Sequence, residues 1–399
     1  MVCIQVHMKL PRCVILCALI CSIVFAQSVS PGTPETQQKV KKQESRDAFL
    51  REQDDDKAKD PKELSFTLRL KNNRKQFQLG EIIPLELSFA SSKPNAYTLD
   101  AATYDRSGRL HSDYFVIDKP DATVDPLYDY FFSQLHGYMM GGLRSIPDLT
   151  DKPHLITADL NEWKRIDKPG HYRLYAVSNR IGTKETRVGS FWNSDRPGLI
   201  SNVIEFDILL SDEKWAKRAL DEAIAVLAKP NSEHNNACRT LRFLGTPAAA
   251  IEMRKRFRGD DNECEWEYKF GLIGSPHRDF VIRDMENAIT LREQPVTSHY
   301  IDTLALLEFT KRAEPMPTHV GDTEKEGKQY NALMDRREKF YNELRLQYVR
   351  QLAMAIPEKQ GQARATSLQT LLDNRSHANR CRRNSKRSPP QRSTMKMAM

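Results

Sequence analysis

The residues of this chain that could do chemistry are histidines, cysteines and carboxylates, and few of them stand at a catalytic spacing. The sequence contains no Gly-rich phosphate loop, no HExxH or GxSxG motif and no CxxC pair. His234 and Cys238 share one face of an expected helix, and Cys264 could join them. A zinc site needs a fourth ligand or a water, and the sequence indicates neither, so we expect no metal and no cofactor.

Other polar residues carry still less information about chemistry. Isolated histidines are typical of hydrogen-bonded structural residues: His111, His136, His154, His171 and His277. The acidic triplet Asp54 to Asp56 lacks the glycine turn and distal glutamate of an EF-hand calcium loop. Carboxylates are scattered through a chain in which 29% of residues are charged. A hydrolase that uses two such carboxylates has no local signature, so this class stays open.

The first 26 residues predict a secretory signal peptide. Lys9 and Arg12 precede the apolar run Val14 to Phe25, and Ala26 offers a small residue for cleavage before Gln27. The run is shorter than the roughly 20 residues that a membrane span needs. An uncleaved anchor is the alternative. With cleavage, we expect a secreted or periplasmic protein of a bacterial cell envelope without a transmembrane span.

The formal net charge of +8 comes from the two ends of the chain. Residues 1–26 and 375–399 together contain ten lysines and arginines and no acidic residue, whereas residues 27–374 carry 51 basic against 53 acidic residues. The folded body therefore has no charge bias towards nucleic acid, and a nucleic-acid partner is not expected. We expect the basic tail, 375–399, to be disordered, or else a reading-frame artefact.

Three cysteines lie outside the predicted signal: Cys238, Cys264 and Cys381. Cys238 and Cys264 fall in adjacent helical units, which makes them the sensible pair in an oxidising compartment. A disulfide that closes a loop of this size would stabilise the fold by about 3 kcal/mol. Two buried free thiols are the alternative.

Alternation of apolar and polar residues predicts a β region over residues 63–210, after a polar and largely disordered spacer at 27–62 with room for one short helix. The expected strands cover residues 64–70, 83–89, 97–104, 110–117, 154–159, 172–176 and 204–210. Glycine-containing segments lead into two of them, Leu79 to Leu85 and Pro169 to Leu174. On these residues the region resembles the immunoglobulin-like or macroglobulin-like β-sandwich modules of secreted bacterial proteins. The resemblance implies an antiparallel sandwich and no chemistry.

Residues 125–144 interrupt this region with an aromatic segment of helical period, marked by Leu127, Phe131, Leu135 and Met139. As a flap for a ligand or partner, its candidate binding residues are Tyr128, Tyr130, Phe131, Phe132 and Tyr138. The alternative is a crossover helix that packs on the sandwich or on the helical half, and aromatic stripes usually have this packing role.

The hydrophobic period changes near Ser211, which we expect to cap the first helix of an all-α domain at 211–374. Leu244-Gly-Thr-Pro247 recurs 29 residues later as Ile273-Gly-Ser-Pro276. In each copy the glycine is expected to end one helix in the left-handed conformation, Thr or Ser to cap the next, and Pro to occupy its first position. On these tetrapeptides residues 212–312 resemble short HEAT-like repeats. A long helix is expected at 323–355 and a last one at 360–372.

These observations predict an α+β multidomain protein, an Ig-like sandwich followed by a HEAT-like helical array. The favoured function is that of a non-enzymatic module that binds an envelope protein or glycan, because repeat arrays form binding surfaces. The alternative is an envelope hydrolase with a site where residues 127–142 meet the helical half. A structural spacer is a third hypothesis.

Overall fold

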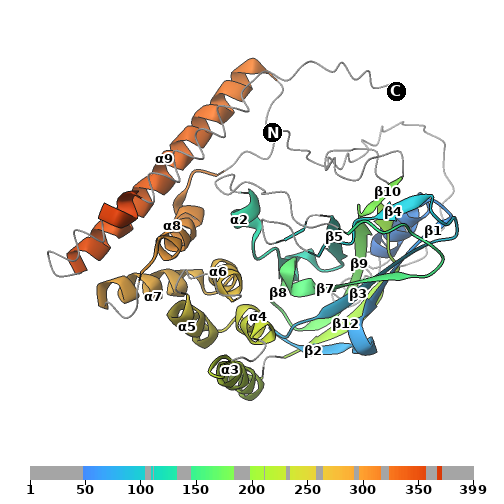
Figure 1. The fold of residues 1–399 in the computed structure, drawn as a ribbon, viewed down its shortest axis with the longest axis horizontal. Helices are drawn as coiled ribbons and strands as arrows, with labels where there is room; N and C mark the ends of the chain where they lie inside the picture. Colours follow the sequence, from blue (N-terminus) through green and yellow to red (C-terminus); the bar gives the residue numbers. More distant parts are fainter. Residues whose placement is uncertain are drawn as a thin grey trace, which may run out of the picture. The chain divides into compact units, whose positions relative to one another are not determined.

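The computed structural model describes residues 48–370, except 104–108, 111, 133–144, 184–197, 211, 231–233, 258–263, 292–295, 316–322 and 356–365. The fold is of mixed α+β class, with sheets in the N-terminal part and helices after them (Figure 1). The predicted signal peptide and basic tail lie outside the described residues. None of the helices within these limits is long and apolar enough to cross a bilayer.

The first sheet is antiparallel, in the order β1 (Leu64–Leu70), β3 (Pro84–Ser91) and β7 (His154–Asp159). Every second residue of β1 is buried, so the predicted alternation of Leu64 to Leu70 is confirmed. Leu68 lies opposite Leu87 and Phe66 opposite Phe89, whose rings stack with centroids 4.5 Å apart. Such apolar pairs on one face hold the register of the strands.

The second sheet is mixed and centres on β9 (Gly170–Ser178). β9 pairs antiparallel with β5 (Asp113–Ile117), β11 (Leu199–Ile200) and β12 (Ile204–Leu209), and β12 pairs parallel with β2 (Gln76–Gln78). Two short ladders join β4 (Tyr97–Leu99) to β10 (Ile181–Thr183) and β6 (Thr123–Val124) to β8 (Arg165–Ile166). Single turns of 3₁₀ helix lie at Lys71–Asn73, Pro120–Ala122 and Leu160–Glu162. The inner faces of the two main sheets share one hydrophobic core.

Within the described residues the strands predicted at 97–104 and 110–117 are shorter, and a buried arginine contacts the backbone after the first and the start of the second. Arg180 donates from Nη1 to the carbonyls of Asp100 and Ala102, at 2.8 and 2.5 Å, and pairs with Asp113 at 2.7 Å. These contacts take the backbone carbonyls that a longer β4 would offer to a neighbouring strand.

Residues 48–57 form a helix inside the segment expected to be a spacer. Phe49 packs on Tyr175 with ring centroids 5.3 Å apart, and Gln53 Nε2 donates to the carbonyl of Ser201 at 2.6 Å. The predicted spacer allowed for one short helix, and an aromatic side chain and an amide of this helix contact β9 and the residue after β11.

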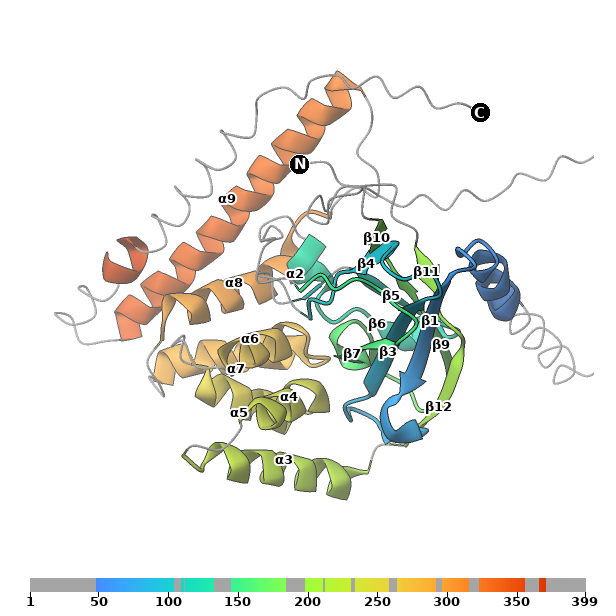
Figure 2. The same ribbon diagram turned by 45° about the vertical axis from the view of Figure 1, so that its right-hand side comes forward.

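In the part of the chain that the structure describes, seven helices of nine or more residues follow the strands, and they share a hydrophobic core with Leu127, Tyr130 and Phe131. They are α3 (Glu213–Leu227), α4 (Asn235–Leu244), α5 (Pro247–Arg256), α6 (Glu265–Ile273), α7 (Arg278–Leu291), α8 (Ser298–Arg312) and α9 (Glu324–Ala355). α6 lies between α4 and α8, and α7 lies between α5 and α9 (Figure 2). Residues 366–370 are also helical.

The first predicted turn between helices is confirmed, and the second differs. Gly245 is left-handed at φ 65°, Thr246 accepts from the Ala249 amide, and Pro247 is the first residue of α5. Gly274 has a φ of −82°, and a Cβ there would lie 3.0 Å from Pro126, so close approach of another segment explains this glycine. The cap of α3 is Asp212, which accepts from the Lys214 amide at 2.9 Å, whereas Ser211 lies outside the described residues.

Two glycines allow a matched test of this account of the turns. Gly245→Ala is expected to lower the free energy of unfolding by about 1 kcal/mol or more, because alanine is strained at a φ of 65°. Gly327→Ala, in α9 with open space around the added Cβ, is expected to raise it by about 0.5–1 kcal/mol. Urea denaturation followed by circular dichroism measures both. Equal effects of the two substitutions would contradict the left-handed role of Gly245.

Candidate functional site

The sheets and helices meet at a cluster of two arginines and three carboxylates. Arg239 and Arg242 project from α4, while Asp159 ends β7, Glu162 follows it, and Glu267 lies on α6. Arg239 contacts all three carboxylates, at 2.7 Å to Asp159, 2.8 Å to Glu162 and 3.1 Å to Glu267. Arg242 contacts Glu162 at 2.5 Å and Glu267 at 2.8 Å. Both arginines therefore join strand-region carboxylates to α6.

Burial makes this cluster a strong structural contact. The Arg242 side chain is 4% exposed and those of Glu162 and Glu267 are each 13% exposed. Burial alone would raise the pKa of Glu162, but the charges of Arg242 and Arg239 outweigh it and lower that pKa below its usual value. Burial likewise acts to lower the pKa of Arg239, and the charges of Glu162, Glu267 and Asp159 raise it instead. The neighbouring opposite charges thus favour the charged forms of Glu162 and Arg239.

Backbone contact reinforces the same junction. Gly80, in the turn between β2 and β3, has a φ of +85°, and a Cβ there would lie 2.6 Å from the carbonyl oxygen of Leu244 at the end of α4. Only glycine allows both this conformation and this approach. Arg165 Nη1 donates to the carbonyl of Gly274 at 2.6 Å, which ties β8 to the end of α6. The two turn motifs that stood out in the sequence are therefore points of contact between sheets and helices.

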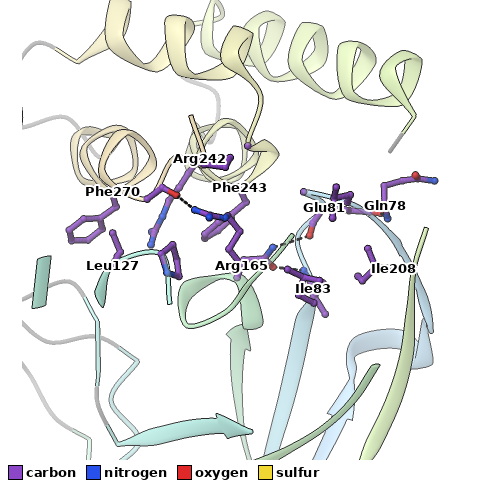
Figure 3. A pocket seen from close by; sticks show the side chains of 17 residues that line it. Gln78, Glu81, Ile83, Leu127, Arg165, Ile208, Arg242, Phe243 and Phe270 are labelled. Carbon is purple, nitrogen blue, oxygen red and sulfur yellow. Dashed lines mark hydrogen bonds between the residues drawn. The ribbon is translucent and has the colours of Figure 1, made fainter. Parts of the chain in front are cut away.

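A cavity of about 30 Å³ lies inside this junction. Ile83 and Ile208 line it from the strand side, and Phe243 and Phe270 line it from α4 and α6 (Figure 3). This volume holds about one water molecule. The ionisable side chains of its wall are bound to protein groups: Glu81 to Arg74, Arg165 to Asp167, and Arg242 to Glu162 and Glu267.

Two aromatic side chains of the segment predicted as a flap pack inside the helical core. In the described part, α2 (Tyr128–Phe132), Tyr130 is 6% and Phe131 4% exposed. Their rings lie 5.2 and 6.2 Å from that of Phe270 on α6, and burial raises the pKa of Tyr130. These contacts agree with the alternative in which the segment has a packing role. Tyr130 and Phe131 could contact a ligand only if α2 moved away from the helical core.

The other candidate residues of that segment are differently placed. Tyr128 is 58% exposed, whereas Tyr138 and the side chain of Phe132 lie outside the described residues. Arg109 holds the segment from the sheet side, with a bidentate contact to Asp125 at 2.8 and 3.0 Å and its guanidinium 4.4 Å from the Phe131 ring.

Cys238 and Cys264 form a disulfide in the structure, with Cα atoms 5.6 Å apart. The bond connects α4 to the residue before α6 and so braces the helices that carry Arg239, Arg242 and Glu267. His234, the possible third zinc ligand, directs Nε2 to the carbonyl of Lys229 at 2.9 Å. The described residues contain no group of three or more side chains suited to a metal ion.

An open groove of about 520 Å³ lies beside the junction and was missed from the sequence. It runs between the turn Gly80 to Ile82 and the facing sides of α3 and α4, and these elements provide Trp215, Ala219, Glu222, Ala223, Val226, Asn236, Ala237 and Thr240. In the sequence Trp215 belongs to an apolar stripe and so predicts core packing. Ala219, Ala223 and Ala237 could have indicated the groove, because short side chains at facing positions of two helices leave space between them.

No protein-family model matches the chain, and no curated protein is significantly similar to it.

The charged cluster predicts a large cost for one substitution. Arg242→Ala is expected to lower the free energy of unfolding by about 3–5 kcal/mol, because Glu162 and Glu267 would stay buried without a full counter-charge. Arg336→Ala, which removes a surface pair with Glu314, is the control and should cost less than about 1 kcal/mol. Urea denaturation at neutral pH measures both.

The difference in stability between wild type and Arg242→Ala is also predicted to depend on pH. Because the pKa of Glu162 is lower in the folded state, its contribution is present above the ordinary value of 4.5 and is lost as the pH falls through the folded-state pKa. The stability difference between wild type and Arg242→Ala should therefore shrink below that pH. A difference that stays constant into acid would contradict the assignment.

A second matched pair tests the packing of α2. Tyr130→Ala is expected to cost about 3–5 kcal/mol, since it leaves a cavity against Phe270. Tyr128→Ala, two residues away and exposed, should change stability by no more than about 0.5 kcal/mol. Thermal unfolding distinguishes them, and a small effect of both would show that α2 is not anchored in the helical core.

Proposed function

We propose that this protein is a non-enzymatic binding protein of the bacterial cell envelope, secreted or periplasmic, whose partner occupies the groove between α3, α4 and the β2–β3 turn. The observation that carries the proposal is the contrast between two neighbouring cavities. The junction cavity has about 30 Å³ and ionisable walls that are already paired, whereas the groove has about 520 Å³, within the size range of ligand sites.

We propose that the elements forming this site belong to an immunoglobulin-like sandwich and an array of HEAT-like helix pairs. Two sheets with a shared core support the first assignment. The alternation of α4, α6 and α8 with α5, α7 and α9 supports the second. The groove then lies where a solenoid-like array begins, held in place by the buried arginines of α4.

The compartment is part of the same proposal. The expected signal peptide at 1–26 supports export, and a disulfide between Cys238 and Cys264 fits an oxidising compartment. The hydrolase alternative needs a cleft where residues 127–142 meet the helices. Among the described residues, Leu127 lines the small junction cavity there.

A groove-blocking variant tests this function. Ala219→Phe places a large side chain among the groove residues, and Ala225→Phe, exposed on the same helix and outside the groove, is the control. Envelope extract is passed over immobilised wild type and each variant, and the retained proteins and glycans are quantified. We expect a component that wild type and Ala225→Phe retain and Ala219→Phe loses by at least about tenfold.

Equal retention by all three proteins would contradict the proposal. Circular dichroism must show that both variants keep the helical content of the wild type. Turnover of an envelope polymer by the wild type, abolished by neither variant, would favour the hydrolase alternative instead.

A further inference from the structure

The groove beside α3 has a shape set by small residues. Ala219 and Ala223 on α3 face Ala237 on α4, and none of the three extends beyond its Cβ. Trp215 and Val226 also line the groove from α3. Because they lie eleven positions apart, the groove follows about 16 Å of this helix. This length suits several residues of an extended chain.

The charges of the groove are acidic. Among the described residues that line it, the ionisable ones are Glu81 and Glu222, and none is a lysine, arginine or histidine. Glu81 is neutralised by Arg74, whose guanidinium nitrogens lie 2.5 and 2.8 Å from its oxygens. Glu222 is exposed and forms no ion pair within the part of the chain that the structure describes. The field in the groove therefore opposes an anionic ligand and favours a cation.

The side chains around Glu222 extend this preference. An indole ring such as that of Trp215 binds ammonium and guanidinium groups better than other aromatic rings do. The chain uses this contact elsewhere, since Lys269 Nζ lies 4.8 Å from the Trp266 ring. The Asn236 amide and the Thr240 hydroxyl oxygen, which still has acceptor capacity while its proton bonds the carbonyl of Asn236, can bind peptide groups.

We propose that the groove binds a lysine- or arginine-bearing segment of a partner protein, with the cation between Trp215 and Glu222. This inference rests on the proposed function and specifies its ligand class. The apolar side chains of Ile82 and Val226 cover the aliphatic stem of such a residue, while its charged end meets the carboxylate.

Calorimetric titration of the purified full chain with synthetic probes tests the proposal. The probes are acetyl-(Gly-Lys)₄-amide, acetyl-(Gly-Arg)₄-amide, the corresponding Gly-Glu peptide and chitotetraose. We expect the two cationic peptides to bind, more weakly at high salt, and the other two not to bind. Trp215→Ala should weaken binding about tenfold, and Glu222→Gln by severalfold with a smaller salt dependence.

Matched controls separate the groove from the rest of the surface. Trp266→Ala removes an exposed tryptophan outside the groove, and Glu213→Gln removes a carboxylate of α3 that does not line it. Neither should change the affinity. Cationic peptides that bind all five proteins equally, or that bind none, would overturn the proposal.

The outcomes also distinguish this inference from the function on which it rests. Binding of chitotetraose alone, sensitive to Trp215→Ala, would overturn the cationic ligand and leave a groove that binds a glycan. Failure of Ala219→Phe to affect any envelope partner would instead remove the proposed function itself.

Discussion

Buried charge pairing between α4 and the end of β7 is the constraint on which the rest of the structure depends. Arg239 and Arg242 lie one helical turn apart and meet carboxylates from both halves of the chain. Removing either partner of such a contact by substitution leaves an uncompensated charge in a medium that solvates it poorly, so each of these residues is costly to replace while the halves stay packed together. The close contact at Gly80 and the packing of the α2 aromatic residues add to this charged cluster at the junction. The Cys238–Cys264 disulfide connects the helices that carry the cluster.

The charged cluster at the junction explains where a functional surface can and cannot lie. Inside the junction the ionisable side chains of the cavity wall are paired with one another or with neighbouring charges, and the remaining space is the size of a water molecule. Beside it, the same placement of α4 sets the β2–β3 turn opposite α3 and leaves the alanine-lined groove between them.

Features that depend on near neighbours in the chain were predictable from the sequence. The strand Leu64–Leu70 follows from alternation, and the turn around Gly245 from the chemistry of four adjacent residues. The junction was not predictable, because Arg242 and Glu162 lie 80 positions apart. The sequence does not show which opposite charge a given charged residue will pair with. Gly274 was misjudged for the same reason, since it owes its role to a distant segment, and the contact of Phe49 with Tyr175 was not predictable either. The groove was hidden because it consists of residues whose side chains are short.

In this account, the buried charged cluster joins the sheets and helices into one cooperative unit. Native-state hydrogen exchange is the most direct test of this claim. Amides of β3 and β9 and amides of α4 and α6 would be followed by mass spectrometry at increasing urea concentration. The account predicts that both sets converge on the same opening free energy and the same urea dependence, because neither half opens without breaking the buried pairs. A helical half that exchanges through an opening of lower free energy, while the sheets stay protected, would contradict it.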